Sequence, residues 1–243
     1  MENVDFEEYT GIDTQTISFS NDVMLVIVLI LLAVFAWIFL MNFSLFRTMI
    51  NNINAGEQRQ SIFEITEQNF LLYNSFMTFQ TILLFSIYTF TSAVKFNYIL
   101  NADIKTMLHS IGLLLVLLFV YYLFKRFLYA LSGMVFLEKS TNKMLITNFQ
   151  ALLNTWGIAL YFPVLWILLF DATPFVSFII LIISYILFKI VLAFRFIDIF
   201  LKKNTGFLFL SSYLCAQEIA PLVFLYQGLT YIYNIIERSN AWQ

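Results

Sequence analysis

One carboxylate stands out in the last long apolar stretch of the chain. Glu218 lies twelve residues after Gly206, which is about 18 Å along a helix and places it near the middle of a bilayer. An acidic side chain there costs on the order of 2.5–3.5 kcal/mol on insertion scales, so it must face protein or water. Pro221 has no N–H to donate to the carbonyl of Gln217. A carboxylate at a helix kink is a common way to build an intramembrane polar site. The first interpretation is a structural Glu218, paired or neutral, and the alternative is a direct role in binding or transport.

Lys189 is the best-placed partner for this carboxylate. It lies twelve residues before Leu201, so it shares the depth of Glu218 if the last two spans form an antiparallel pair. Tyr185, one turn away, offers a hydrogen bond. The alternative is that Lys189 extends its ammonium to the cytoplasmic interface. The candidate intramembrane polar site comprises Glu218, Lys189, Pro221, Tyr185, Asn154 and Asn74.

Basic side chains at the cytoplasmic ends of the expected spans form a second candidate site. Such a collar usually sets membrane topology and touches anionic lipid headgroups. A sharper alternative is a pocket for a lipid phosphate, for which arginine offers forked donors. The collar consists of Lys125, Arg126, Arg195, Lys202 and Lys203.

No catalytic or metal-binding pattern accompanies these residues. His109 and Ser110 are neighbours, but a nucleophilic pair also needs an orienting group and an oxyanion site, and no G-x-S-x-G elbow occurs. The chain has one cysteine, Cys215, and one histidine, which excludes clusters of these ligands. H-E-x-x-H and phosphate-binding loop motifs are also missing. We therefore expect no catalytic residues, no metal and no cofactor.

The elements that must position these side chains are transmembrane helices. The chain is 61% hydrophobic and only 12% charged, and its apolar runs reach the 20 or so residues that cross a bilayer. We expect an all-α, polytopic bundle over residues 22–238, between an acidic exposed tail (1–21) and a short tail (239–243). About six spans are predicted, at 23–41, 69–94, 108–136, 146–170, 175–196 and 207–235.

The distribution of Lys and Arg predicts the orientation. With both termini outside, ten of the 13 basic residues fall in cytoplasmic segments and three in outer segments, as the positive-inside rule requires. No internal repeat between the two sets of three spans is evident.

Two segments carry a resemblance to a known family. Leu214 to Leu222 reads L-C-A-Q-E-I-A-P-L, and Gly157 to Pro163 reads G-I-A-L-Y-F-P. With the sizes and order of the spans, these segments resemble a domain-of-unknown-function family of six-span integral membrane proteins from Bacteroidota. The resemblance implies the inner membrane of a two-membrane bacterium, and it brings no biochemical activity.

The leading functional hypothesis is a non-enzymatic inner-membrane subunit or scaffold of an envelope process such as protein export, secretion or envelope assembly. The alternative is a transporter or permease for lipids or small solutes, with Glu218 and Pro221 at its site. A membrane-embedded lipid transferase is third. The expected partners are membrane lipids, including anionic ones, and other membrane-protein subunits, without nucleic acid.

Overall fold

The computed structural model describes residues 14–41, 67–96, 104–136, 139–170, 173–201 and 221–231, and every structural statement below concerns these. Nearly all of them are α-helical, and no strand occurs within these ranges. The labelled helices are α1 (Thr14–Met41), α3 (Glu67–Lys95), α4 (Ile104–Phe136), α5 (Lys139–Ala159), α6 (Tyr161–Leu169) and α7 (Pro174–Leu201). Residues 221–231 form a further helix. The predicted all-α class is confirmed.

Five helical stretches are long and apolar enough to cross a membrane, so the chain is a helical membrane protein. They are Asn21–Met41, Leu72–Lys95, Met107–Leu131, Ile146–Leu169 and Pro174–Phe194. In lipid, only helices and closed barrels give every backbone N–H and C=O group a hydrogen-bond partner. Long apolar runs therefore fold as helices. These stretches fall on the first five predicted spans. Most of the sixth, at 207–235, lies outside the described residues, and 221–231 within it is helical.

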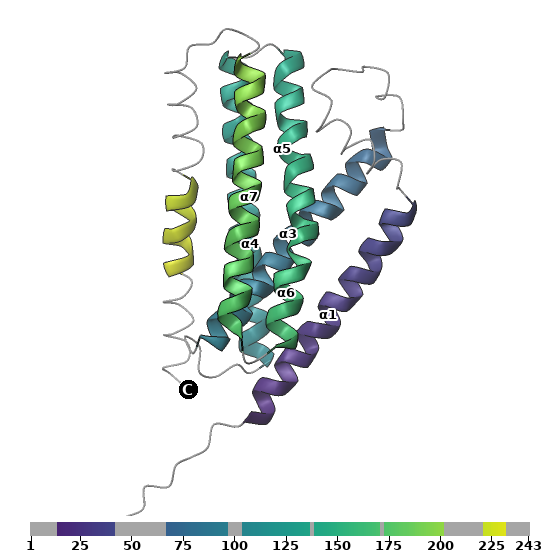
Figure 1. Cartoon of the computed structure of the whole chain (residues 1–243), viewed down its shortest axis with the longest axis vertical. Helices are drawn as coiled ribbons and strands as arrows, with labels where there is room; N and C mark the ends of the chain where they lie inside the picture. The colour runs from purple at the N-terminus through teal and green to yellow at the C-terminus, as the bar shows by residue number, and fades with distance from the viewer. Residues whose placement is uncertain are drawn as a thin grey trace, which may run out of the picture.

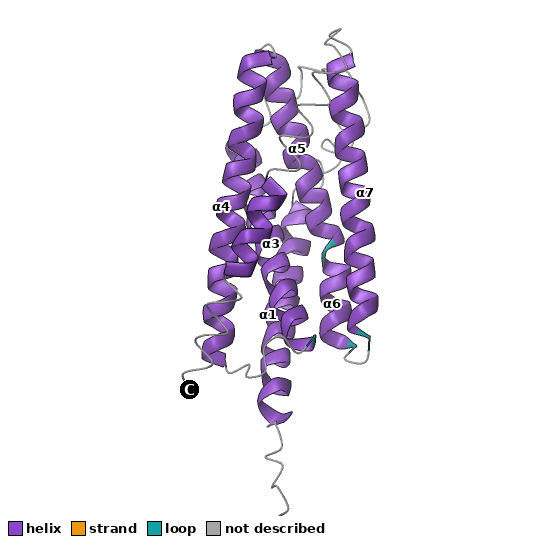
Figure 2. Ribbon diagram, turned by 90° about the vertical axis from the view of Figure 1, so that its left-hand side faces the viewer, coloured by secondary structure: helices purple, strands orange, loops and turns teal. Residues whose placement is uncertain are grey.

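The helices form a bundle with α3 running obliquely through it (Figure 1). α3 contacts α1, α4, α5 and α6, and α7 packs on α5 and α6. Figure 2 shows α6 continuing the line of α5, with α7 alongside both. In Figure 1, α1 and the 221–231 helix lie on opposite sides of the bundle. α4 and α7 run in the same direction, since α5 and α6 lead back between them.

The predicted fourth span, 146–170, is two helices rather than one. The helical hydrogen bonds from Leu160 N to Trp156 O (3.0 Å) and from Val164 N to Leu160 O (3.1 Å) are present. Pro163, however, has no N–H to donate to the carbonyl of Ala159, so the ladder is interrupted and α5 ends there. The Ser177 hydroxyl of α7 donates to the Pro163 carbonyl (2.8 Å) and holds this break against the neighbouring helix.

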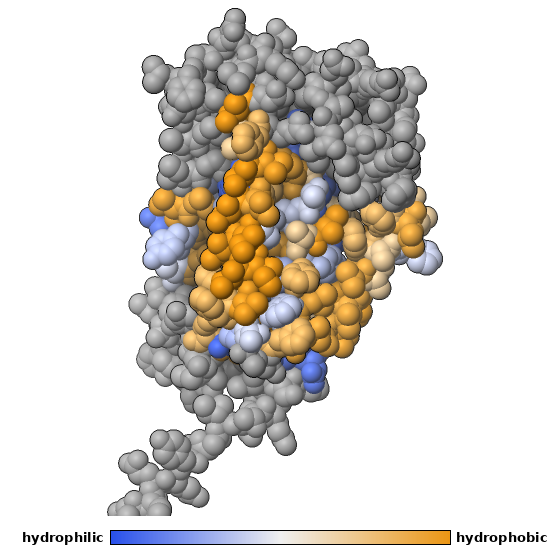
Figure 3. All heavy atoms as spheres, viewed as in Figure 1, coloured by the Kyte–Doolittle hydropathy of each residue, from blue (hydrophilic) through white to orange (hydrophobic). Residues whose placement is uncertain are grey.

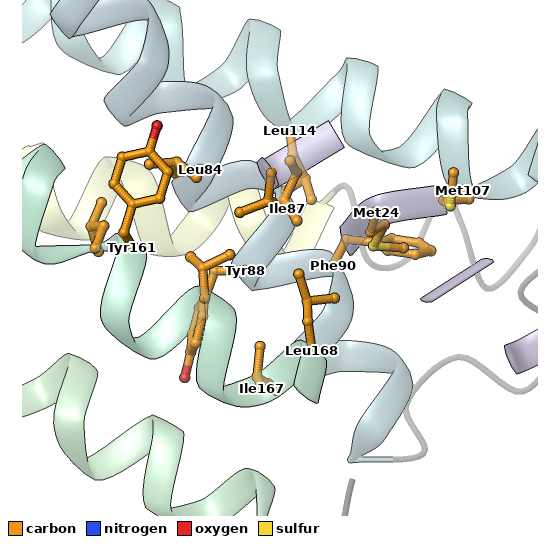
Figure 4. Close-up of a cluster of buried hydrophobic side chains, with 13 residues drawn as sticks. Met24, Leu84, Ile87, Tyr88, Phe90, Met107, Leu114, Tyr161, Ile167 and Leu168 are labelled. Atoms are coloured by element: carbon orange, nitrogen blue, oxygen red, sulfur yellow. The ribbon is translucent and has the colours of Figure 1, made fainter. Parts of the chain in front are cut away.

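One end of the bundle is solidly packed where α1, α3, α4 and α6 meet (Figure 4). We call this cluster the closed core. Leu84 and Ile167 are among its fully buried members, and the Lys95 ammonium of α3 donates to the Ile167 carbonyl near the end of α6. A cation at a helix C-terminus is favourable there. The labelled side chains in Figure 4 are Met24, Leu84, Ile87, Tyr88, Phe90, Met107, Leu114, Tyr161, Ile167 and Leu168.

The outer face of α7 is apolar along its length. It appears as the central apolar column in Figure 3. Phe175, Ile179, Ile183, Ile186 and Phe194 are all exposed on this helix. A surface of this composition suits contact with lipid tails.

Candidate functional site

A cavity of about 240 Å³ lies between α3, α4, α5, α7 and the 221–231 helix. α3 contributes Thr81, Ile82 and Phe85 to its wall, and the 221–231 helix contributes Leu222 and Leu225. The wall is overwhelmingly apolar and aromatic. Its chemistry therefore depends on the few polar groups that reach it.

Two lysines from different helices line this cavity. Lys125 belongs to α4 and is only 4% exposed, and Lys189 belongs to α7. The Lys125 ammonium lies 5.7 Å from the ring centroids of both Tyr129 and Phe149. The Lys189 ammonium lies 5.3 Å from the Tyr185 ring. Cation–π contacts at these distances attract the charge to the ring face, so aromatic rings position both ammonium groups in the wall.

On α4 and on α7 the lysine is the cavity-lining residue nearest the C-terminal end of the helix. The Lys125 ammonium contacts the Phe149 ring of α5, whereas the Tyr185 ring beneath the Lys189 ammonium meets Trp156, seven residues farther along α5. The two lysines therefore lie toward the same end of the cavity, with their ammonium groups beside different levels of α5. We call this part of the cavity its basic end.

The opposite part of the cavity is apolar, and we call it the apolar end. Leu118 lies seven residues before Lys125, and Leu181 lies eight before Lys189. The cavity thus extends about 10–12 Å along the helices from one end to the other.

Trp156 of α5 is the largest side chain of the wall. Its ring stacks on Phe188 at 5.5 Å and meets Phe85 at 5.7 Å. Tyr185 approaches its edge at 5.9 Å. The indole N–H of Trp156 is buried without a hydrogen-bond partner, which is uncommon for this donor.

A chain of hydrogen bonds borders the cavity and joins α4, α5 and α3. We call it the polar chain. The Tyr122 hydroxyl, in the cavity wall, accepts from the Arg126 guanidinium (3.4 Å) and donates to the Gln150 amide oxygen (3.1 Å). The Gln150 amide nitrogen donates to the Thr78 hydroxyl (2.7 Å). Thr78 in turn donates to the carbonyl of Asn74 (2.9 Å). Buried polar groups satisfied in this way fix the relative positions of three helices.

The described residues of the predicted intramembrane polar site lie in two places. Lys189 and Tyr185 line the cavity together, with the ammonium over the ring. Asn154 donates its amide to the Asn74 side chain (2.5 Å) at the end of the polar chain, and neither lines the cavity. Pro221 is buried at the start of the 221–231 helix. Glu218 lies outside the described residues, so its pairing with Lys189 stays a prediction.

The residues of the predicted collar are also divided. Lys125 lies in the cavity wall, and Arg126 is exposed and joins the polar chain. Arg195 belongs to α7, but its side chain lies outside the described residues, as do Lys202 and Lys203. Lys125 and Lys189, which the sequence interpretation assigned to two sites, share one cavity.

Several residues of this region were missed. Gln150 and Thr78 had a usable signal, because each lies four residues, about one helical turn, from Asn154 and Asn74. Trp156 and Phe188 had none, because aromatic side chains are frequent throughout this chain. Among the described residues no cluster of three His, Cys, Asp or Glu is suited to a metal ion.

Comparison with known proteins gives one match. The family model described as "Domain of unknown function (DUF4271)" matches residues 24–229. No curated protein and no solved structure matches the chain.

Proposed function

Since this chain belongs to the DUF4271 family, and since that name carries no activity, we propose from its own geometry that it is a membrane protein that binds a lipid-like amphiphile in its cavity. The observation that carries the proposal is the composition of one cavity wall. An apolar end suits hydrocarbon, and a basic end with Lys125 and Lys189 suits an anionic headgroup.

The size of the cavity supports a ligand of this kind. An apolar cavity of about 150 Å³ stays dry and takes up benzene, and pockets for drug-sized molecules begin at about 300 Å³. At about 240 Å³ this cavity falls between the two. A hydrocarbon chain in the cavity would gain dispersion contacts with its apolar wall.

The same proposal includes a topology of six spans with both termini outside, in a bacterial inner membrane. The Lys/Arg distribution supports it. In this orientation, the basic end of the cavity lies near the cytoplasmic headgroups. An anionic lipid of that leaflet would reach the lysines without carrying its charge across the hydrocarbon.

A subunit or scaffold of an envelope process, such as protein export, secretion or envelope assembly, is the second candidate. The apolar outer face of α7 favours it, because such a face can pack on a partner helix as well as on lipid. Lipid binding is the first candidate because the cavity has a defined apolar wall that includes two lysines.

Native mass spectrometry of the protein, released from mild detergent, tests the proposal. We expect the wild type to retain lipid at a fixed stoichiometry. Leu181→Trp places a large ring in the cavity wall and should abolish retention. Leu187→Trp, on the exposed side of the same helix, is the matched control and should retain lipid.

Equal retention by Leu181→Trp and wild type would contradict binding in the cavity. A protein partner at fixed stoichiometry, with no retained lipid, would favour the second candidate instead.

A further inference from the structure

The cavity has an opening, which the exposed residues of its wall locate. We propose that a lipid chain enters the cavity sideways from the hydrocarbon core of the bilayer, through a portal between α7 and the 221–231 helix; this rests on the proposed lipid binding. Ile182 of α7 and Leu222 of the 221–231 helix form the rim of the portal. The ligand is therefore the hydrocarbon chain of a lipid already in the membrane, rather than a compound dissolved in water.

The exposure of the wall carries the first step. Ile182 is 40% exposed and Leu222 is 37% exposed, and both line the cavity. Every lining residue that α3, α4 and α5 contribute is buried or half-buried. Among the described residues, only α7 and the 221–231 helix therefore extend the cavity wall to the outer surface of the bundle.

The packing of the 221–231 helix, yellow in Figure 1, carries the second step. Its Phe224 ring meets the Phe124 ring of α4 at 5.7 Å between centroids. A Cβ on Gly228 would lie 2.6 Å from the Leu117 Cδ1 of α4, so the two helices approach closely at this glycine. These contacts close the boundary with α4, and the exposed lining residues place the opening at the boundary with α7.

The portal lies at the depth of the lipid chains. Ile182 is eight residues after Pro174 and twelve before Phe194, which are the two ends of the apolar stretch of α7. At about 1.5 Å per residue, it lies about 12 Å from one end and about 18 Å from the other. The hydrocarbon core is about 30 Å thick, so the rim faces lipid chains rather than water. A chain can therefore reach the cavity without leaving the hydrocarbon.

Trp156 lies close to the portal and supplies the test. Tyr185 is three residues, about one helical turn, from Ile182 on α7. The Tyr185 ring approaches the edge of Trp156 at 5.9 Å, and both rings line the cavity. A chain that passes Ile182 therefore comes close to the indole.

Quenching of Trp156 fluorescence by brominated lipid tests the route. The reporter is the full chain with Trp37→Phe, Trp166→Phe and Trp242→Phe, which leaves Trp156 as the only indole. It is placed in phosphatidylglycerol nanodiscs, with and without a 9,10-dibromostearoyl chain on the lipid. We expect strong quenching by the brominated lipid and weak quenching by iodide, which stays in water. Quenching by iodide alone would mean that the cavity opens to water, and any failure of the brominated lipid to quench would overturn the portal.

Variants of the rim show whether the chain passes between the two helices. Ile182→Phe combined with Leu222→Phe narrows the portal at two exposed positions and should weaken quenching by the brominated lipid severalfold. Ile183→Phe combined with Val223→Phe is the matched control, because both residues are exposed and neither lines the cavity. The control should be quenched like the reporter without rim changes. Equal quenching of the two pairs would overturn the portal.

Lipid retention in native mass spectrometry of the unmodified chain separates this portal from the proposed function. Retained lipid with an unquenched reporter would overturn the portal and leave lipid binding intact. Rim-dependent quenching without retained lipid would uphold the portal and overturn stable binding. Absence of both retention and quenching would overturn both.

Discussion

α3 packs against its neighbours in two different ways. On one side Leu84, Ile87 and Phe90 are fully buried in the closed core with α1, α4 and α6. On another side Ile82 and Phe85 face the cavity. The cavity wall has no shortage of large side chains, since it includes Trp156 and several other rings. Among the described residues, therefore, this side of α3 borders a hollow lined by large side chains, whereas its other side is buried in the closed core.

The contrast matters because helices in lipid associate through packing rather than through a hydrophobic driving force. A region that is packed solid contributes to the stability of the bundle by dispersion contacts. A hollow region contributes less and is available to a ligand. The two regions should therefore respond differently to the same substitutions.

The largest effect is expected at Gly157, where α5 lies close to Thr81 of α3. A Cβ on Gly157 would lie 1.9 Å from the Thr81 hydroxyl oxygen and 3.0 Å from the Thr81 Cβ. Gly157→Ala should therefore destabilise the bundle by about 3 kcal/mol, because overpacking forces the helices apart. The midpoint of unfolding in a denaturing-detergent titration measures it.

Gly112→Ala is the matched control, because nothing lies within 4 Å of a Cβ at that position. It should be neutral or slightly stabilising. Thr81→Ala combined with Gly157→Ala should recover part of the loss. If the two single glycine variants unfolded at the same midpoint, the close approach described for α3 and α5 would be wrong.

The next effect compares the two regions directly. Leu84→Ala in the closed core should cost about 2 kcal/mol, because it opens a new void among fully buried neighbours. Leu153→Ala in the cavity wall enlarges an existing void and should cost less than about 1 kcal/mol. Thermal unfolding of delipidated protein is the measurement. If both variants lost the same stability, the cavity would have to be filled by protein side chains.

A smaller effect is expected in the polar chain that borders the cavity. Gln150→Leu leaves the Tyr122 and Thr78 hydroxyls without their amide partner, and such interhelical hydrogen bonds are worth about 0.6–1.7 kcal/mol in membranes. We expect a loss of about 1 kcal/mol in the unfolding titration. Gln227→Leu, at an exposed position, is the control. If the two variants unfolded at the same midpoint, the polar chain would not fix the relative positions of the three helices.

The smallest effect is expected on the outer face of α7. Ile179→Val and Ile186→Val should leave both unfolding and cell growth unchanged, because lipid tails adapt to either side chain. A growth defect at normal protein level would indicate a partner helix on this face, in favour of the subunit proposal.

Much of the fold could be predicted because long apolar runs have few alternatives in lipid. Five helical stretches long enough to cross a membrane coincide with the first five predicted spans, whereas the break at Leu160 was not predicted. Pro163 gave a direct signal for it, since a missing N–H interrupts the helical ladder. The predicted span continued across the proline because the apolar run itself is unbroken.

The site could be predicted only in part. Lys125 and Lys189 were singled out because charges are rare in apolar stretches, but depth alone assigned them to different sites. Their common cavity depends on which way each helix face turns, and α4 is apolar nearly all round, so periodicity gave no direction. Asn74 and Asn154, which the sequence interpretation placed in one candidate site, contact each other through one hydrogen bond.

The break between α5 and α6 also has a mechanical consequence. A helix that lacks one hydrogen bond in its ladder is least stiff at that level, here at Leu160, where α5 enters the closed core. Bilayers that are thinner or thicker than the bundle impose tilt on its helices, and we expect that tilt to be absorbed at Leu160. Spin labels at positions 146 and 169 should report a distance that changes with nanodisc lipid length, and an unchanged distance would argue for a rigid joint. In thin membranes α5 would tilt, whereas α6 would stay in place because Ser177 binds the Pro163 carbonyl. The thickness of the surrounding bilayer would then determine the cavity volume available to a ligand.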